Sequence, residues 1–409
     1  MKSQIGNQQS QIAIVGAGPA GSSLAIRLAA RGFGVTLVER ESFPRHKLCG
    51  EFISPECLRH FSELGADGIL SAGGERISET RFYDRRGRDF TIPSSMLDGA
   101  GFALSLSRFE MDRQLINRAR DVGVSVLEKT RPAAVEMDDG RITSLLLSGE
   151  SGQPDRLEAG LFVDATGRAG VLSKLIERSG RQEARRSGRP SLAVGFKAHF
   201  ENARVDPGTC EIYFFPGGYG GLTPIENGAA NLCFIVDPRA ARKLGSDPNG
   251  ILRNAVMRNA RAADTLEKAR PAADWLAVSV NSFGRAEQAE ADNLSAVGDA
   301  AAFIDPFTGS GMLMALESSA LLAEAVVAHA HDASAIARVY SSSYDRVFSR
   351  RLRVCSYLRR AAFVPLVPTL AISFFNFSKR GRSFLALSTR SADRFAAGRD
   401  TMYNPSRDS

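Results

Sequence analysis

The sequence, 409 residues long, is poor in the residues that build metal centres and disulfide frameworks. It has five cysteines and five histidines, and no two cysteines stand in a Cys-x-x-Cys pair. Disulfide scaffolds, zinc centres and other metal sites are therefore not expected. Basic residues do not alternate with aromatic ones, so the sequence does not predict binding to nucleic acid.

A long apolar run is missing from the N-terminus, where residues 1–10 are mostly polar. Such a start lacks the apolar core of a secretory signal, which favours a cytoplasmic location. Hydrophobic residues make up 44% and charged residues 24% of the chain, as is typical of a globular enzyme. At this length the chain is expected to fold as more than one packed unit.

The most informative feature that is present is the segment 16–21, Gly-Ala-Gly-Pro-Ala-Gly. It follows the apolar run 12–15 and opens the apolar stretch 20–30, and Glu39 ends the next apolar run, 35–38. A strand, a glycine turn, a helix, a second strand and an acid in this order predict a dinucleotide-binding unit. The candidate cofactor-binding residues of this unit are Gly16, Gly18, Pro19, Ala20, Gly21, Glu39 and Arg40.

The three glycines of this segment have separate physical roles. Gly16 permits the tight turn, Gly18 lets the backbone approach a pyrophosphate, and Gly21 lets the helix pack on the strand. The pyrophosphate is expected at the positive N-terminus of the helix. Glu39 is expected to accept hydrogen bonds from a ribose.

Two further motifs follow predicted buried strands much later in the chain. The strand 161–163 ends in residues 164–167, Asp-Ala-Thr-Gly. The strand 294–297 ends in Gly298-Asp299, and Asp-Pro-Phe-Thr-Gly-Ser-Gly follows at 305–311. In their order and spacing the three motifs resemble those of the FAD-dependent superfamily that shares the para-hydroxybenzoate hydroxylase fold.

This resemblance implies an α/β fold in which a Rossmann-like FAD-binding domain is interrupted by an inserted β-sheet substrate domain and followed by C-terminal helices. The expected FAD-binding parts are 1–75, 106–180 and 286–331, the substrate-domain parts are 76–105 and 181–285, and the C-terminal helices with a basic, apolar tail occupy 332–409.

The resemblance implies one non-covalently bound FAD, and the third motif supports this by its own chemistry. Asp299 follows a buried strand, where an unpaired carboxylate is costly and a ribityl hydroxyl is a suitable partner. Pro306 stiffens the backbone expected to face the ring, and residues 309–311 open a helix whose N-terminus favours the negative charge of reduced flavin. The further candidate cofactor-binding residues are Arg108 (at the position of the family's flavin-contacting arginine), Asp164, Gly298, Asp299, Pro306, Gly309, Ser310 and Gly311.

Residues 43–51, Phe-Pro-Arg-His-Lys-Leu-Cys-Gly-Glu, resemble the corresponding segment of geranylgeranyl reductases. This makes Cys49 the candidate to contact the reacting centre; the alternative is that it is a small, buried hydrophobic residue. His46 and Glu51 are candidate proton donors, although loop residues of these types are also common on the surface.

Residues 215–224 resemble the aromatic turn over the substrate cavity in the same family. Tyr219, Gly220 and Gly221 are therefore the candidate substrate-cavity residues. Gly221 stands where relatives often carry tryptophan, which would widen the cavity. The alternative is a simple glycine hairpin.

Three reactions are compatible with this resemblance. We expect a reductase that transfers hydride from flavin N5 to the C=C bond of an isoprenoid or other lipid-like substrate. A monooxygenase acting on an aromatic or polyketide substrate is the alternative. A halogenase is less favoured, because the halogenase signature Trp-x-Trp-x-Ile-Pro needs two tryptophans and the chain has one, Trp275. No second glycine motif of this type follows, so the electrons are expected from transient NAD(P)H or another donor.

Residues 361–378 form an uncharged, apolar segment with arginines before it and lysine and arginine after it. Apolar residues flanked by cations are typical of a segment that lies in a membrane interface. The sequence thus predicts peripheral contact with the inner face of the membrane through residues 359–382. A lid packed on the protein's own core is the alternative.

Overall fold

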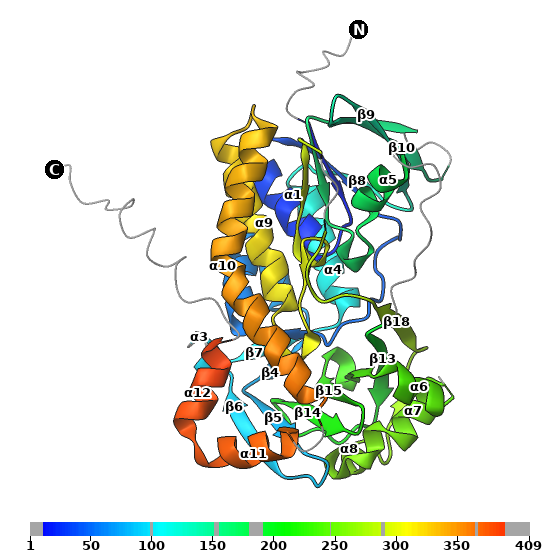
Figure 1. Ribbon diagram of the computed structural model, residues 1–409, viewed down its shortest axis with the longest axis vertical. Coiled ribbons are helices and arrows are strands. Elements are labelled where there is room, and N and C mark those ends of the chain that lie inside the picture. Colours follow the sequence, from blue (N-terminus) through cyan, green and yellow to red (C-terminus); the bar gives the residue numbers. More distant parts are fainter. Residues whose placement is uncertain are drawn as a thin grey trace, which may run out of the picture.

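The computed structural model describes residues 11–98, 101–150, 155–179, 191–245, 247–287, 291–364 and 367–388. These residues form two units, each built on one large β-sheet, with one long helix running along both (Figure 1). We call them the five-stranded unit and the eight-stranded unit. The predicted α/β architecture, with an inserted β-sheet, is confirmed.

The five-stranded sheet is wholly parallel, because every neighbouring pair of its strands runs in the same direction. Its strands are nearly continuous apolar runs, as expected for a sheet that is buried on both faces. In spatial order they are β20 (Leu294–Ala296), β12 (Leu161–Asp164), β1 (Gln11–Val15), β2 (Gly34–Val38) and β8 (Ser125–Leu127).

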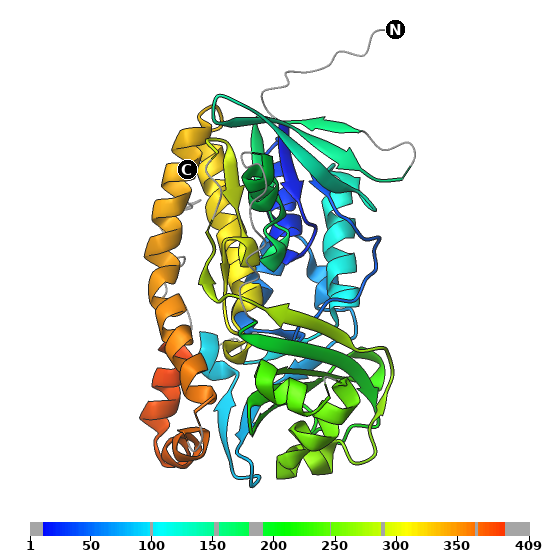
Figure 2. The same ribbon diagram turned by 45° about the vertical axis from the view of Figure 1, so that its right-hand side comes forward.

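Helices cover one face of this sheet and a small antiparallel sheet covers the other (Figure 2). The helical face carries α1 (Pro19–Ala29), α4 (Arg108–Asp121), α9 (Gly311–Ala328) and α10 (Ala333–Ala362). The opposite face carries β9 (Arg131–Asp138), β10 (Arg141–Ser148), β11 (Arg156–Glu158) and α5 (Val171–Ser179). Small residues let α1 and α9 approach closely, and the hydroxyls of Ser23 and Ser319 lie 2.6 Å apart between them.

The eight-stranded sheet is antiparallel except where β14 and β5 run side by side in parallel. Its strands are β17 (Arg270–Pro271), β18 (Leu276–Val280), β13 (Ala193–Glu201), β16 (Ala230–Val236), β15 (Gly218–Pro224), β14 (Thr209–Phe215), β5 (Glu79–Tyr83) and β6 (Asp89–Pro93). Alternate residues form a core with three short helices, α6 (Pro238–Lys243), α7 (Pro248–Asn254) and α8 (Ala260–Thr265). The remaining residues of each strand point to the other face of the sheet, as strand geometry requires.

Short strands and helices connect the two units. One small sheet has the order β3 (Phe52–Ile53), β7 (Ala103–Ser105) and β4 (Glu75–Ile77), and another pairs β19 (Gly284–Arg285) with β21 (Ala302–Phe303). The short helices α2 (Pro55–Glu63) and α3 (Ser95–Asp98) stand beside them. The first small sheet positions the segment 47–53 between the two units.

The C-terminal residues form two further helices, α11 (Val367–Phe377) and α12 (Lys379–Ser388), which pack against β6 and α3 (Figure 1). Among the described residues one helix, α9, is long and apolar enough to cross a membrane, and it is mostly buried inside the protein. The pair α10 and α11 passes the same test only if it is taken as one broken span, bent by 115°.

Candidate active site

The glycine turn lies between β1 and α1, at the carboxyl edge of the parallel sheet. Gly16 has φ +102°, and a Cβ atom at this position would lie 2.4 Å from the carbonyl oxygen of Ala165. Only glycine fits this turn, which therefore packs directly on the second motif. Gly18 is the N-cap of α1, and within the described residues no side chain caps this helix. The N-terminus of α1 therefore keeps its positive dipole end and N–H groups that can bind an anion.

The third motif meets the first two at the same edge. Gly298 has φ +60°, and a Cβ atom there would lie 2.8 Å from Cβ of Ala20. On the other side, a Cβ atom on Gly167 would lie 4.0 Å from Cβ of Asp299. Three segments far apart in the sequence thus converge outside the carboxyl ends of the strands, where open α/β sheets bind their ligands.

The Asp164 carboxylate is used within its own turn. It accepts hydrogen bonds from the backbone N–H and hydroxyl of Thr166, at 3.0 and 2.6 Å, and from the backbone N–H of Leu172 at 2.9 Å. Burial raises the pKa of Asp164, and these hydrogen bonds oppose that shift. Asp164 therefore acts on the site indirectly, by stabilising the turn at residues 164–172.

A chain of alternating buried charges runs beside the glycine turn. Arg45 bridges two acids, donating to Glu39 at 3.1 Å and to Asp112 at 2.8 Å. Asp112 also accepts two hydrogen bonds of 2.8 Å from Arg108. The Arg108 guanidinium lies 3.7 Å from the position that a Cβ atom on Gly18 would take, so a cation stands where a pyrophosphate would approach the turn.

Glu39, expected to bind a ribose, is held in place by this chain. Its carboxylate accepts the backbone N–H of Ala17 at 3.0 Å in addition to Arg45. Burial alone would raise the pKa of Glu39, but Arg45 and the Ala17 N–H group keep it below its usual value. Arg40, the neighbouring candidate, is exposed and pairs with Glu41 at 3.2 Å.

The Asp299 carboxylate is suited to accept a hydrogen bond from a hydroxyl group of a ligand. Within the described part of the chain its carboxylate has no hydrogen-bond or ion-pair partner. Burial raises its pKa from 3.8 to about 6, and the charges of Arg168, Arg108 and Lys47 oppose the shift. A carboxylate of this kind fits the ribityl hydroxyls of a flavin.

This raised pKa predicts a pH dependence for the flavin-free protein. Between about pH 4 and about pH 6 the folded state holds more protons at Asp299 than the unfolded state does. The contribution of Asp299 to the free energy of unfolding is therefore present at low pH and decreases as the pH rises through about 6. Denaturant unfolding of the wild type and of Asp299→Asn at several pH values measures this difference, and parallel curves would show that Asp299 is not buried as described.

The third motif ends at the start of α9. Asp305 accepts the backbone N–H of Phe307 at 2.9 Å, and Pro306 takes the first position of the short turn Pro306–Thr308. Gly309 has φ +59°, and a Cβ atom there would lie 3.3 Å from the Phe52 ring. The N-cap of α9 is Ser310, whose side chain makes no capping hydrogen bond, and the N-terminus of α9 presents the positive end of its dipole here.

Tyr219 connects the eight-stranded sheet to this motif. Its hydroxyl donates a hydrogen bond to Asp305, and its ring contacts Phe307 and Phe363 edge-on, with centroids 5.4 and 5.8 Å apart. Phe214 adds a fourth ring, 6.5 Å from that of Tyr219. These rings come from β14, β15, the third motif and the end of α10, and together they form an apolar wall beside the third motif.

A side chain at Gly220 and one at Gly221 would lie on opposite faces of the sheet. A Cβ atom on Gly221 would lie 3.0 Å from Cδ1 of Ile212, on the same face as Tyr219. A Cβ atom on Gly220 would lie 2.6 Å from Cβ of Phe234, in the core on the far face. The sequence predicts Gly220 to be a substrate-cavity residue. In the strand, however, successive residues face opposite sides of the sheet, so Gly220 faces the far core and not the side of Tyr219.

Cys49 and Glu51 lie between the two units, against the N-terminus of α4. Glu51 is fully buried and its backbone has φ +56°. Its carboxylate accepts the backbone N–H of Arg108 at 2.7 Å, and the Cys49 sulfur accepts the backbone N–H of Glu51 at 3.4 Å. The segment 49–52 therefore connects two parts of the site: Glu51 contacts Arg108, and Phe52 lies against Gly309 at the start of α9.

Two residues of β13 complete a cluster around Glu51. The Lys197 ammonium is ion-paired with one carboxylate oxygen, and His199 Nε2 lies 2.8 Å from the other. Burial alone would raise the pKa of Glu51, but the bond to His199 and the charge of Lys197 bring it below its usual value. Glu51 is thus held as a charged hydrogen-bond acceptor between Lys197, His199 and the backbone N–H of Arg108.

His46 joins the cluster to solvent. Its exposed ring lies 5.5 Å from that of His199 and 4.9 Å from that of Phe109. Desolvation, together with the charges of His199 and Lys197, lowers the pKa of His46. The exposed His46 ring thus lies beside His199, which in turn contacts the buried carboxylate of Glu51.

Sequence reasoning missed Arg45, Lys197 and His199. The sequence did contain a signal for Lys197 and His199. They are polar residues two positions apart in the otherwise apolar strand β13, so their side chains lie on the same face of the sheet. Arg45 lies inside a segment that was singled out, but nothing in the sequence indicates that it bridges Glu39 and Asp112.

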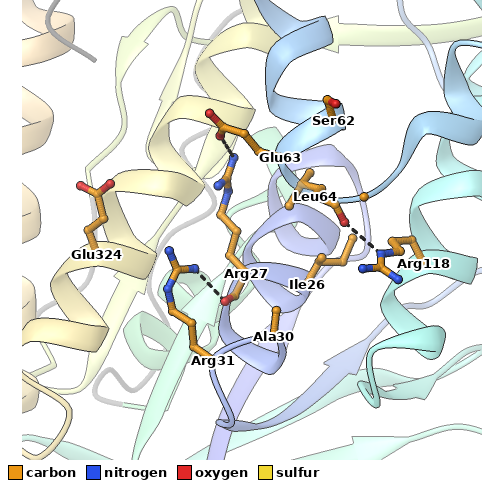
Figure 3. Close-up of a pocket in the computed structure, with 10 residues that line it drawn as sticks. Ile26, Arg27, Ala30, Arg31, Ser62, Glu63, Leu64, Arg118 and Glu324 are labelled. Carbon is orange, nitrogen blue, oxygen red and sulfur yellow. Dashed lines mark hydrogen bonds and ion pairs between the residues drawn. The ribbon is translucent and has the colours of Figure 1, made fainter. Parts of the chain in front are cut away.

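A separate pocket of about 640 Å³ lies at the opposite end of α1 from the glycine turn (Figure 3). Its cations are engaged locally: Arg27 pairs with Glu63 at 3.3 Å, and Arg118 donates to the carbonyl of Leu64 at 2.9 Å. Arg31 likewise donates to the backbone carbonyl of Arg27. This pocket is not part of the site where the three motifs meet.

The comparison with known protein families agrees with this geometry. A model described as an FAD binding domain matches residues 9–347, and the chain belongs to this family. It is therefore an FAD-dependent enzyme of the oxidoreductase and monooxygenase superfamily, with FAD as its cofactor. The superfamily expected from the sequence is confirmed.

Two kinds of relative are equally similar to the chain in sequence. A flavin-dependent halogenase of Armillaria mellea is 27% identical over 336 residues, which cover 75% of this chain and 63% of the halogenase. A digeranylgeranylglycerophospholipid reductase of Methanosarcina acetivorans is 27% identical over 350 residues, which cover 84% of this chain and 80% of the reductase.

Solved structures show the same fold. A flavin-dependent brominase has a TM-score of 0.74 and 20% identity, and the match covers 89% of this chain and 92% of the brominase. A geranylgeranyl bacteriochlorophyll reductase-like protein from Thermoplasma acidophilum has a TM-score of 0.73 and 18% identity, over 94% and 96% of the two chains.

Proposed function

We propose that the protein is an FAD-dependent reductase that saturates C=C bonds of an isoprenoid or other lipid-like substrate. The observation that carries this proposal is the buried cluster of Glu51, Lys197 and His199 beside Cys49. Saturation of an alkene needs a hydride and a proton, and this cluster can supply the proton at the junction of the two units.

The residues at the carboxyl edge fit an FAD molecule. The uncapped N-terminus of α1 and Arg108 would hold the pyrophosphate, Glu39 the ribose and Asp299 a ribityl hydroxyl. The N-terminus of α9, with its positive dipole end, would face the pyrimidine side of the ring. When bound, FAD supplies the hydride from N5, and the protein contributes position and charge.

The proposed proton transfer balances the hydride. The hydride forms a C–H bond at one alkene carbon, and a proton from the cluster forms a C–H bond at the other, so the product gains H2 across the former double bond. His199 is the proposed donor, because it faces both Glu51 and the solvent-linked His46. Glu51 is a positioning residue that orients His199, and Cys49 is the candidate to touch the substrate.

The apolar wall supports a lipid-like substrate. Tyr219, Phe307, Phe214 and Phe363 gather around the third motif, and the only polar group that Tyr219 carries is bound to Asp305. Relatives of the chain include lipid reductases. Transient NAD(P)H or another carrier is the proposed electron donor.

A monooxygenase or halogenase is the second candidate, favoured by the halogenase relatives of equal identity. The two candidates differ in the reaction of the reduced enzyme. A monooxygenase needs reduced flavin to react with O2 before the substrate changes, whereas a reductase needs only the alkene.

We expect the dithionite-reduced protein to be reoxidised by a geranylgeranyl lipid in the absence of O2. The flavin absorbance should return, and mass spectrometry should find the saturated product. If the lipid leaves the flavin reduced, while O2 reoxidises it and oxygen or halogen enters an aromatic substrate, the reductase proposal is wrong.

The variant His199→Asn tests in the same experiment whether His199 donates the proton. A general acid typically contributes about a hundredfold or more to a rate, so reoxidation by the lipid should slow by about that factor with FAD still bound. His331→Asn, on the exposed turn after α9, should react as the wild type does. Equal rates in all three proteins would remove His199 from the reaction.

A further inference from the structure

The two C-terminal helices carry an exposed apolar face. Leu370, Phe374 and Phe377 are 67%, 60% and 90% exposed and stand at positions i, i+4 and i+7, which lie on one side of α11. Phe384, on α12, is 71% exposed. Isolated exposed apolar residues are common, but four large ones on two adjacent short helices form a patch that indicates an interaction.

The other side of the same helices is packed on the protein. Ile372 is 1% exposed, and the ring of Phe375 lies 5.3 Å from that of Phe90 on β6. Arg382 donates to the backbone carbonyl of Thr91, also on β6, at 3.4 Å. The helices are therefore anchored by one face, and the exposed face is held in a fixed orientation.

The charge of this region has one sign. From residue 346 to residue 392 the sequence contains ten Lys and Arg residues and neither Asp nor Glu. Arg353, Arg360 and Arg380 are exposed, and Tyr357, on the last turns of α10, is 69% exposed. An apolar face with aromatic residues and a surround of cations without acids is complementary to an anionic lipid surface.

We propose that α11, α12 and the end of α10 dock the protein on an anionic membrane surface. The side chains of Leu370, Phe374, Phe377 and Phe384 enter the boundary between headgroups and acyl chains, and the exposed arginines contact the headgroup phosphates. Phe363 ends α10 and touches Tyr219 of the apolar wall. The end of α10 thus contacts both the docking region and the apolar wall.

This proposal does not depend on which reaction the flavin performs. Docking is measured by binding alone, so a monooxygenase with this surface would dock as well. Conversely, a reductase that takes its substrate from solution would fail this test and pass the reoxidation test. The sequence left open whether the segment contacts a membrane or forms a lid. The structure assigns Ile372 and Phe375 to the packed face and leaves the other face for the membrane.

The test is cosedimentation of the FAD-bound protein with vesicles of phosphatidylcholine containing phosphatidylglycerol. The wild type should bind, and the double variant Phe374→Ser with Phe377→Ser should bind at least tenfold more weakly. Leu192→Ser, at an apolar residue that is 49% exposed on the eight-stranded unit, is the matched control and should bind as the wild type does. Arg360→Glu with Arg380→Glu should remove the preference for phosphatidylglycerol, and high salt should weaken binding of the wild type without abolishing it.

Flavin content and melting temperature show whether the serine variant folds. If it does not fold, a fluorescence measurement on a tryptophan variant tests the proposal instead. Phe377→Trp places a fluorophore on the exposed face, and its emission should shift to shorter wavelength when vesicles are added. Leu192→Trp should show no shift. Absence of wild-type binding would overturn the proposal. It would also be overturned if this face instead joined two copies of the chain, seen as a dimer that Phe374→Ser with Phe377→Ser dissociates.

Discussion

Replacing Lys197 with methionine is expected to lower the free energy of unfolding by about 3–5 kcal/mol. Lys197 is 2% exposed and pairs with a Glu51 carboxylate that is itself fully buried. Without Lys197 the buried carboxylate keeps only His199 and the backbone N–H of Arg108, and removing one partner of a buried pair costs far more than the pair contributes. Since a typical domain is stable by only about 5–15 kcal/mol, this single change should make the fold marginal. Denaturant unfolding, read by fluorescence and circular dichroism, measures the change.

Two controls separate this effect from loss of a lysine as such. Lys129 pairs with Glu150 at 2.8 Å on the surface, and Lys129→Met should leave the free energy of unfolding nearly unchanged. Adding Glu51→Gln to Lys197→Met should recover much of the lost stability, because the uncompensated charge is removed. A cost below about 1 kcal/mol for Lys197→Met alone would contradict the buried pair.

Replacing Asp299 with alanine is expected to weaken FAD binding by about tenfold or more. A hydrogen bond to a charged group contributes about 1.5–3 kcal/mol, and about 1.4 kcal/mol corresponds to a factor of ten in affinity. The fold should persist, because the carboxylate has no partner within the described residues that its removal would disturb. Titration of the flavin-free protein with FAD, followed by flavin fluorescence, gives the dissociation constant.

The matched control for this variant is Asp292→Ala, at an exposed acid just before β20. Its affinity for FAD should equal that of the wild type. Unchanged binding by Asp299→Ala would place Asp299 outside the cofactor site. In that case the pH dependence expected for the flavin-free protein would still hold, because it rests on the desolvation of Asp299 and not on the cofactor.

The cofactor side of the site was predictable because its determinants are local. The glycine turn, its flanking strands and Glu39 lie within one short stretch of sequence, and each later motif follows a buried, mainly apolar strand. Parallel strands place their carboxyl ends at one edge, so motifs that follow such strands meet there. The contacts of Gly16 with Ala165 and of Gly298 with Ala20 follow from that geometry.

The substrate side was less predictable because its contacts join residues far apart in sequence. Lys197 and His199 reach Glu51 across about 150 residues, and Tyr219 reaches Asp305 across 86. Whether a strand residue faces the site or the far core depends on register, which no local motif fixes. Gly220 shows this, since one step along β15 separates it from the face of Tyr219.

The discontinuous five-stranded sheet determines the order in which the protein can be completed during synthesis. β12 leaves the ribosome with its outer edge unpaired, and its neighbour β20 follows only after residues 165–293 have been made. Throughout that interval the nascent chain exposes an apolar strand edge, which is a template for wrong pairing. The last motif and the N-terminus of α9 emerge later still, so the three FAD motifs can meet only after residue 311 has been made. The cofactor can therefore stabilise the complete site only once most of the polypeptide has been translated.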